Sequence, residues 1–557
     1  MAGMGNSTQE AFVTSYIKGS RCDLRLPFRS EGQAIDRLLT PVLMNATCSN
    51  VDQAPFFNQL LQKPSVPGGW WTGTAILLVL YCIYEQISFA ASRHRAGFKS
   101  VRGPQYAVPL VGCVIAMVKN PYQFWEDQRK YSFPGLSWNS LCGKFMIFTT
   151  DAEISRRVFT YNDPDTLLMA VHPSGKNILG EGNLAFMHGP PHKAIRKSFL
   201  SLFTRKALAT YVELQDGIIR EHLKQWQQVE GEREIRLFVR DLNVATSRSV
   251  FAGPYFESKE EIEKFGKAFL HMTEGFLALP ICIPGTAVWK GKQGRLYILD
   301  LLEKAAARSK ASMKEGNSPR CLMDFWAQRC LEEIKEAEEQ KVAAAGHTTD
   351  RAMADTVMDF LFASQDATTS AVVWVTVLMA DYPDVLQKVR EEQRRLRPDL
   401  NAPITGEVLN EMVYTRQVVK EVLRFRPPAP MVPQIAQKPF RLTEDYVAPK
   451  GALIMPSIVA ANMQGFSNPL VFDPDRFSPE RKEDIKYQKN FLTFGHGPHY
   501  CVGKDYAVNQ IICFLANMST SCEWTRRKTK SDDSNWLYLP TIYPADSLIT
   551  LKVAAQS

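Results

Sequence analysis

A single cysteine lies in a glycine-rich loop near the C-terminal end of the chain. Residues 494–503 read FGHGPHYCVG, and an apolar helical pattern follows at 506–515. Glycines let a backbone lie close to a bound group, and a turn before a helix offers amide hydrogen bonds and a positive dipole end, which favour a thiolate. The loop therefore suits Cys501 as a ligand. On the loop alone two alternatives stay open, a zinc site of His496, His499 and Cys501, or an inert thiol.

The composition excludes several other kinds of site. The chain has 557 residues, of which 45% are hydrophobic and 22% are charged, so it can bury a large core. Its net charge of +8 mildly favours acidic partners or an anionic membrane surface, and no basic cluster is interleaved with aromatic residues in the manner of a nucleic-acid site. The 11 cysteines include no C-x-x-C pair, which argues against a zinc ribbon and a disulfide scaffold.

The cysteine loop resembles the haem-binding loop of cytochrome P-450 monooxygenases. Phe494, Gly497, His499 and Gly503 surround Cys501 at the spacing of that loop, with His499 where the family has a basic residue. The resemblance implies a mainly α fold with small β-sheets, haem b as cofactor, and Cys501 as the axial iron ligand whose thiolate favours O–O cleavage. It also implies electrons from NADPH, delivered by a cytochrome P-450 reductase.

Two charged motifs upstream strengthen this resemblance. KEVLRFRPPAP contains Glu421 and Arg424 at i, i+3 on an expected helix, and FDPDRF contains Arg476. A Glu–Arg pair at this spacing is by itself a frequent surface pair. In the family the corresponding three residues interlock, so we expect Glu421, Arg424 and Arg476 to form a buried network, which persists only when every charge is paired.

One landmark near the expected haem propionates is altered. The segment HKAIR places His192 and Arg196 where the family usually has Trp and Arg. Together with His499 these residues are cations or donors suited to a pair of carboxylates.

The expected central helix also departs from the family pattern. Residues 363–368 read ASQDAT, whereas the family has threonine at the position of Ala367. Ala363 and Ala367 lie on one helical face, where small side chains leave room over the iron. We expect Asp366 and Thr368 to deliver protons. The alternative is that Asp366 caps or bridges the helix, Thr368 packs, and water carries the protons past Ala367.

Four segments narrow the resemblance to the sterol C-22 desaturases of fungi, plants and algae: FLFASQDATTSA, RFRPPAPMVPQIA, QGFSNPLVFDPDRF and NFLTFGHGPHYCVG. The resemblance runs from about Arg102 to Val553. It implies formation of the C22=C23 double bond in a sterol side chain, with O2 and electrons from NADPH, at the endoplasmic reticulum membrane. A sterol hydroxylase of the same family is the first alternative, and a non-catalytic haem or sterol carrier in the membrane is the second.

A sterol requires a mostly hydrophobic pocket with few polar groups. The apolar segment 277–285 is the expected entrance from the membrane. The resemblance implies that the walls of the pocket include Leu168, Phe186, Phe362, Ala363, Ala367, Ala429, Met431, Val432, Thr541 and Ile542.

The N-terminal part of the chain predicts a membrane anchor. Residues 70–91 form an apolar segment long enough to span a bilayer, with Trp70 and Trp71 at one end and basic residues from Arg93 onward at the other. The one carboxylate, Glu85, lies near the C-terminal end of this segment, where it could reach the interface. A buried amphipathic helix is the alternative.

These flanks predict a single-pass protein of the endoplasmic reticulum with three further parts. Residues 1–69 would be luminal, residues 92–112 would form a proline- and glycine-rich linker, and residues 113–557 would form the cytosolic catalytic domain.

The expected orientation separates possible sites of modification. Asn6 and Asn45 are glycosylation acceptors on the luminal side, whereas Asn517 falls on the cytosolic side and should stay unmodified. Cys22 and Cys48 could pair with each other in the lumen.

Apolar periodicity predicts a largely helical catalytic domain. The expected helices are Lys206–Gln228, Lys259–Ala278, Gly294–Met313, Leu322–Ala344, Met353–Met379 and Pro383–Leu396, and the expected strands are Lys144–Thr149, Phe440–Leu442 and Ala452–Pro456.

Overall fold

The computed structural model describes residues 68–93, 101–132, 135–161, 163–256, 258–529, 536–538 and 541–554. The chain divides into two units, residues 1–77 and 78–557, and the strands among these described residues all belong to the second unit. The predicted acceptors Asn6 and Asn45, and the pair Cys22 and Cys48, lie outside the described residues.

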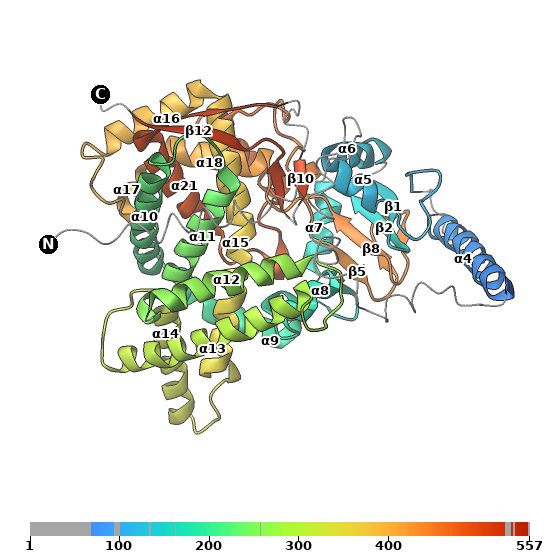
Figure 1. Ribbon diagram of the computed structural model, residues 1–557, viewed down its shortest axis with the longest axis horizontal. Coiled ribbons are helices and arrows are strands. Elements are labelled where there is room, and N and C mark those ends of the chain that lie inside the picture. Colours follow the sequence, from blue (N-terminus) through green and yellow to red (C-terminus); the bar gives the residue numbers. More distant parts are fainter. Residues whose placement is uncertain are drawn as a thin grey trace, which may run out of the picture. The chain divides into compact units, whose positions relative to one another are not determined.

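The second unit is mainly helical, as the resemblance implies (Figure 1). Its longer helices are α6 (Pro121–Tyr131), α7 (Ala152–Thr160), α9 (Gly189–Ser198), α10 (Arg205–Gln227), α11 (Ile235–Ala252), α12 (Lys259–Phe276), α13 (Ala287–Lys314), α14 (Leu322–Glu339), α15 (Asp350–Asp381), α16 (Pro383–Leu396), α18 (Val413–Phe425) and α21 (Lys504–Ser521). Shorter turns that bear on the site are α5 (Val114–Lys119), α8 (Pro173–Leu179), η3 (Leu184–Phe186), η6 (Gly346–Thr348), α19 (Ile458–Ala461), η7 (Pro474–Phe477), α20 (Glu483–Lys486) and η9 (Gly497–His499).

All six predicted helices are present, and their ends show which local signals the apolar pattern missed. α13 begins at Ala287, seven residues before the prediction, because the Thr286 side chain caps it by accepting from the Trp289 amide. α14 ends at Glu339 rather than Ala344. The reversal there uses Lys341 in a left-handed conformation, with a φ of 55°, a position where glycine is the usual signal.

α15 is the central helix of the unit. It packs against α11, α13 and α21, and every side chain from Thr368 to Met379 is buried. A helix that is apolar on all sides over such a stretch must lie within the core. The Thr349 side chain caps its start, and Tyr382 followed by Pro383 separates it from α16.

A five-stranded sheet lies beside α7 (Figure 1). Its order is β1 (Leu136–Leu141), β2 (Lys144–Thr149), β8 (Leu453–Pro456), β5 (Gln434–Ala436) and β3 (Leu167–Met169), and β2 has the predicted bounds. β1 and β2 form a hairpin whose two turn residues, Cys142 and Gly143, both have positive φ, as a two-residue turn of this kind requires. Three further small sheets combine β4 (Glu232–Glu234), β6 (Phe440–Arg441), β7 (Val447–Ala448), β9 (Cys522–Arg526), β10 (Trp536–Tyr538), β11 (Ile542–Pro544) and β12 (Leu548–Val553).

The predicted anchor segment is helical. α4 covers Gly68–Arg93, and its stretch Trp70–Arg93 is long and apolar enough to cross a membrane, with a mean hydropathy of 1.6 over its most apolar 18 consecutive residues. Its side chains from Trp70 to Tyr84 are mostly exposed, unlike those of a core helix. The helix therefore meets the length and composition requirement for a span.

Glu85 does not have the environment expected from the sequence. Its carboxylate is buried and accepts from the Leu110 amide at 3.0 Å, while the Gln86 side chain exchanges two hydrogen bonds with the Ala107 backbone. Phe89 packs against Trp138, with ring centroids 6.1 Å apart. The last part of α4 is thus bound to the linker and to the β1–β2 hairpin, because the linker backbone supplies donors that its side chains satisfy.

The segment expected to form the entrance is an exposed apolar connection between α12 and α13. Leu277, Leu279, Ile281 and Ile283 are each 45% exposed or more. Four apolar side chains in one short loop form a surface suited to contact with lipid or another apolar partner.

Candidate functional site

The cysteine loop is folded tightly before α21. Gly495 and Gly497 have φ values of 73° and 72°, and a Cβ at Gly497 would lie 2.4 Å from the carbonyl oxygen of Phe159. The Cys501 amide donates to the Phe494 carbonyl at 2.9 Å, which closes the loop. Glycine is therefore required at 497 for two reasons, the backbone conformation and the approach of α7.

The Cys501 thiol faces an internal cavity. It is accessible from this cavity, yet it lies deep in the protein, and this burial raises its pKa. The Gly503 amide and the charge of Arg196 act in the opposite direction. The chain thus offers hydrogen-bond and electrostatic support for a thiolate, and a bound cation would provide the remaining stabilisation.

The cavity has a volume of about 340 Å³ and a mainly apolar lining. Ten of the residues singled out from the sequence line it: Ala363, Ala367, Thr368, Ala429, Val432, Phe494, His496, His499, Cys501 and Gly503. The cysteine loop and the small-residue face of α15 therefore lie on one cavity, although more than 120 residues separate them in the sequence.

Six of the expected pocket residues lie elsewhere. Leu168 gives way to its neighbour Met169 on β3, because side chains alternate along a strand. Met431 lies before β5, in an isolated bridge to Ser457, and is buried in the core instead. Phe362 packs on Phe276, with centroids 5.0 Å apart. Phe186 lies in η3, beside the lining residue Ala185. The Thr541 hydroxyl bonds to α15, and the Ile542 backbone bonds to α15 and to the segment before β5.

The two expected proton-delivery residues differ in position. Thr368 lines the cavity, whereas Asp366 lies outside its lining, near Arg240 and Arg236 of α11. Burial raises the pKa of Asp366 to about 6, against the opposing charges of those two arginines. Its backbone carbonyl accepts from the Tyr543 hydroxyl at 3.2 Å. A carboxyl with such a pKa can exchange protons near neutral pH.

Histidines and one arginine gather beside the cysteine loop. The rings of His192 and His499 stack with centroids 4.2 Å apart, and His188 meets His499 edge-on at 5.2 Å. Arg196 donates to the Tyr500 carbonyl at 2.7 Å. His188 was not singled out from the sequence, although its position four residues before His192 could have drawn attention to it.

Burial determines the charge of this cluster. It lowers the pKa of His192, and it lowers the pKa of His499 to about 4, with further contributions from the neighbouring histidines and Arg196. The histidines are thus neutral donors or acceptors at neutral pH, and Arg196 is the cation. The sequence allowed the histidines as well as Arg196 to be cations, whereas the structure leaves Arg196 as the one cation of this cluster.

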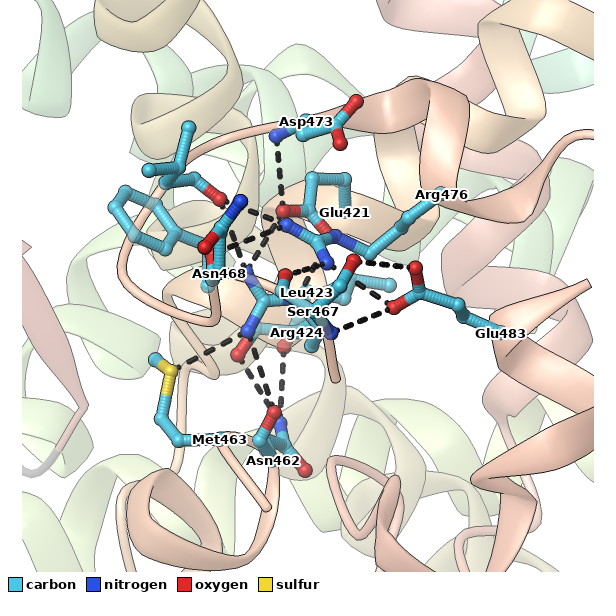
Figure 2. A network of polar contacts seen from close by, with 12 residues as sticks. Glu421, Leu423, Arg424, Asn462, Met463, Ser467, Asn468, Asp473, Arg476 and Glu483 are labelled. Atoms are coloured by element: carbon cyan, nitrogen blue, oxygen red, sulfur yellow. Dashed lines mark hydrogen bonds and ion pairs between the residues drawn. The ribbon is translucent and has the colours of Figure 1, made fainter. Parts of the chain in front are cut away.

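A buried charged network surrounds Glu421 (Figure 2). Glu421 lies 2.7 Å from Arg424 and 3.1 Å from Arg476, and the side chains of all three residues are fully buried. The Asp473 amide also donates to Glu421. The structure therefore brings together the three residues that the two motifs singled out.

A fourth member, Glu483, balances the charge of the network. It lies 3.2 Å from Arg476, so that two buried arginines face two carboxylates. Burial opposes ionisation of Glu483, but hydrogen bonds from Ser467 and Arg481 and the charge of Arg476 outweigh it and lower its pKa to about 2. No motif or periodic pattern singles out Glu483, because it follows a left-handed residue, Lys482, in the short turn α20.

Asn462 connects this network to the cysteine loop. Its carbonyl accepts from Arg424 at 3.3 Å, and its side chain binds the Leu492 amide and the Thr493 hydroxyl, each at 2.8 Å. Thr493 lines the cavity directly before the loop. The network thus holds the start of the cysteine loop through a short chain of hydrogen bonds.

The residues present fit a haem better than they fit zinc. The cavity joins a thiol on a glycine-rich loop, open apolar space beside Ala363 and Ala367, and polar groups suited to carboxylates. Across the described part of the chain, no group of three or more His, Cys, Asp or Glu side chains is arranged to bind a metal ion. The zinc alternative of His496, His499 and Cys501 therefore has no geometric support.

Comparison with known proteins gives a consistent result. The family model described as "Cytochrome P450" matches residues 101–542. Cytochrome P450 710A4 of Arabidopsis thaliana is 38% identical over 476 residues, 84% of this chain and 94% of the relative. The C-22 sterol desaturase erg5 of Aspergillus fumigatus is 33% identical over 497 residues, 85% of this chain and 93% of the relative. The solved structure of retinoic acid bound cyanobacterial CYP120A1 shares the fold, with a TM-score of 0.66 at 23% identity over 82% of this chain and 99% of that one.

Proposed function

Because the chain belongs to the cytochrome P450 family, we propose that it is a sterol C-22 desaturase. The reaction would remove one hydrogen from each of C22 and C23 of a sterol side chain. O2 would be reduced to two waters by those two hydrogens, two electrons from NADPH and two protons. The observation that carries the proposal is the similarity to the C-22 sterol desaturase of Aspergillus fumigatus across 93% of that protein.

Haem b, held by Cys501, would supply the activation of O2 and the oxidation. Arg196, His192 and His499 would bind its carboxylates, and Phe494 and Gly503 would lie against it on the side of the cysteine loop. Electrons would come from an NADPH-dependent cytochrome P450 reductase. The basic surplus of the chain suits a reductase with an acidic docking face.

The residues of α15 would determine whether an alkene or an alcohol forms. Ala363 and Ala367 leave space over the iron, so the sterol side chain can present both hydrogens at once. Thr368 lines the same cavity, and Asp366 lies two residues before it on the helix. We assign Thr368 and Asp366 to proton supply during the reduction of O2.

The product distinguishes this proposal from its alternatives. Purified holoprotein, reductase and NADPH are incubated with a sterol that has a saturated side chain, and the products are separated and weighed by mass spectrometry. A product lighter by two hydrogens supports desaturation. A product heavier by one oxygen identifies a sterol hydroxylase, and sterol binding with no NADPH consumption identifies a carrier.

We also propose that α4 anchors the protein in the endoplasmic reticulum membrane with residues 1–69 in the lumen. The apolar stretch of α4 and the basic residues after it support this orientation. Expression in a eukaryotic secretory membrane tests it, since glycan should appear at Asn6 or Asn45. Glycan at Asn517 would contradict the orientation, and Asn517 is in any case buried, with its amide bound to Asp216 at 2.8 Å.

Sealed microsomes give a second test of the orientation. Protease added outside should digest the part of the chain after Arg93 and spare the N-terminal segment. Protection of the catalytic part, with loss of the N-terminal segment, would reverse the assignment.

A further inference from the structure

A second cavity lies along α15, closer to the start of that helix. Its volume is about 500 Å³, and unlike the first cavity it has many charged and polar residues in its walls. They come from four places: the segment 180–187, α13, η6 and the first turns of α15. The principal polar members are Asn183, Arg295, His347, Asp355 and Asp359.

The two cavities are separated by a thin wall. η3 contributes Leu184 to the second cavity and the next residue, Ala185, to the first. On α15, Asp359 lines the second cavity, whereas Phe360 and Ala363 line the first. Movement of the single turn η3 would therefore join the two spaces along one face of α15.

Asp359 holds this wall in place. Its two carboxylate oxygens accept from the Asn183 side chain and from the Leu184 amide, the latter at 2.8 Å. Each carboxylate oxygen can accept a second hydrogen bond, so Asp359 retains capacity for a ligand.

The arginines near Asp359 form ion pairs with its neighbour Asp355 instead. Arg295 pairs with Asp355 at 2.8 Å, and Arg351 reaches the same carboxylate at 3.5 Å. Within the described residues no ion pair reaches Asp359, and burial raises its pKa to about 7. Near neutral pH this carboxyl can thus both accept and donate, which suits an uncharged hydroxyl better than a cation.

The shape of a sterol explains why such a group is needed. A sterol is a rigid apolar plate whose hydroxyl lies at the opposite end from its side chain, and a buried hydroxyl without a partner is strongly unfavourable. Asp359 precedes Ala367 by eight residues, an axial distance of about 12 Å on a helix. That distance is comparable to the length of a fused four-ring nucleus.

We propose that the second cavity is a subsite for the hydroxyl-bearing end of the substrate, with Asp359 as the hydrogen-bond partner of that hydroxyl. The sterol side chain then lies beside Ala363 and Ala367, and the nucleus extends along α15 past a displaced η3. This subsite rests on the proposed sterol desaturase function, because it requires a substrate with one hydroxyl at the far end of a rigid body.

Gln434 is the competing partner within the first cavity. It lies on β5, away from the start of α15, and its side chain is partly exposed to the cavity. Binding of the hydroxyl at Gln434 would turn the nucleus toward the sheet and leave the second cavity without a role in recognition. The two arrangements predict different variants as the sensitive ones.

The test measures sterol affinity of the holoprotein from the change in the haem absorption spectrum on binding. The same sterol is titrated with its hydroxyl and with that hydroxyl replaced by hydrogen. Wild-type protein should bind the hydroxyl form about tenfold more tightly, the effect of one ordinary hydrogen bond. Asp359→Ala should abolish this difference, Asp359→Asn should keep most of it, and Gln434→Leu should leave it intact.

Two further variants separate recognition from the stability of the wall. Asn183→Ala weakens the hold on η3 but leaves Asp359, so the preference for the hydroxyl form should persist. Ala352→Phe fills the second cavity without changing Asp359, and it should weaken sterol binding at least tenfold while imidazole binds the haem as in the wild type. Normal sterol affinity in Ala352→Phe would overturn the subsite.

The outcomes distinguish this inference from the proposed function. Equal wild-type affinity for the two sterols, or loss of preference in Gln434→Leu but not in Asp359→Ala, would overturn the subsite and leave the desaturase proposal in place. Absence of any spectral change with either sterol would overturn the sterol function and the subsite together.

Discussion

The charged network of Glu421, Arg424 and Arg476 and the two carboxyls of α15, Asp359 and Asp366, differ in how completely they are paired. In the network, all three side chains have no exposed surface, and each contacts a partner of opposite charge. On α15, Asp359 lines a cavity and Asp366 lies near two arginines, and burial raises the pKa of both.

The difference teaches what each group can do. A fully paired network has one favourable arrangement, and loss of any member leaves a buried charge. Burial raises the pKa of Glu421 as well, but its carboxylate lies against two arginines. Among the described residues no ion pair reaches Asp359 or Asp366, so these carboxyls can change protonation without leaving a paired cation behind, which suits proton transfer and ligand exchange. The structure therefore predicts that substitutions in the network act on folding, whereas substitutions of the α15 carboxyls act on turnover and binding.

The strongest test concerns Cys501 itself. Cys501→Ser should abolish the carbon-monoxide difference band of a thiolate-bound ferrous haem and all sterol turnover, because serine does not provide a thiolate. Absorption spectroscopy of the reduced protein checks this. A normal band in Cys501→Ser would show that Cys501 is not the haem ligand and would contradict the haem site built around it.

The next largest effect is expected in the charged network. Glu421→Ala leaves Arg424 and Arg476 short of a carboxylate and should destabilise the protein by about 3–5 kcal/mol, with little haem-loaded protein recovered. Urea unfolding and haem content measure it.

Arg481→Ala is a matched control for the network, since Arg481 pairs with Glu483 but is partly exposed. A loss of about 1 kcal/mol or less is expected there, because solvent screens exposed pairs. Equal destabilisation by Arg481→Ala and Glu421→Ala would contradict the distinction between buried and exposed members.

On α15, Asp366→Asn should slow sterol turnover by about 100-fold and divert electrons to peroxide, with haem content and sterol affinity near normal. Thr368→Ala should act in the same direction. The ratio of NADPH consumed to alkene formed measures the effect. Unchanged coupling in Asp366→Asn would assign Asp366 a structural role and leave the protons to water.

The pH dependence sharpens this prediction. With a pKa of about 6, the protonated fraction of Asp366 falls as pH rises through that value, so a donor role makes turnover fall with rising pH. Arg236, Arg240 and Tyr543 are the other charged or titratable groups that act on Asp366, and burial raises the pKa of Tyr543 well above its usual range. A fall that is identical in Asp366→Asn would exclude this residue as the source.

The smallest effect is expected at the histidine cluster. His192→Phe keeps a ring against His499 but removes the nitrogens that could bind a haem carboxylate. Haem should dissociate about tenfold faster, the effect of one lost hydrogen bond. Transfer of haem to apomyoglobin measures the rate, and an unchanged rate would assign the cluster to packing.

The sequence predicted the parts of the fold that depend on local pattern or ordered motifs. The helices followed from apolar periodicity, and Glu421, Arg424 and Arg476 followed from the order of two motifs and a cysteine loop. The sequence did not predict Glu483 as a member of the network, because its position depends on a turn that begins with a left-handed lysine. Met169, rather than Leu168, lines the cavity because successive side chains of a strand point to opposite faces.

The second cavity could not have been derived from the chain alone. Its walls come from segments up to about 180 residues apart, and no spacing pattern connects Asn183 with Asp359. Only the closure of η3 on α15 brings them together.

The contacts at the end of α4 have a consequence for producing a soluble form of this protein. Removal of residues up to 93 would strip Phe89 from Trp138 and Phe145 and leave the Leu110 amide without its carboxylate acceptor. Such a truncated chain should aggregate through the uncovered aromatic surface. A chain cut just before Glu85 loses most of the apolar stretch but keeps this cover, so it should be the better starting point for expression without detergent.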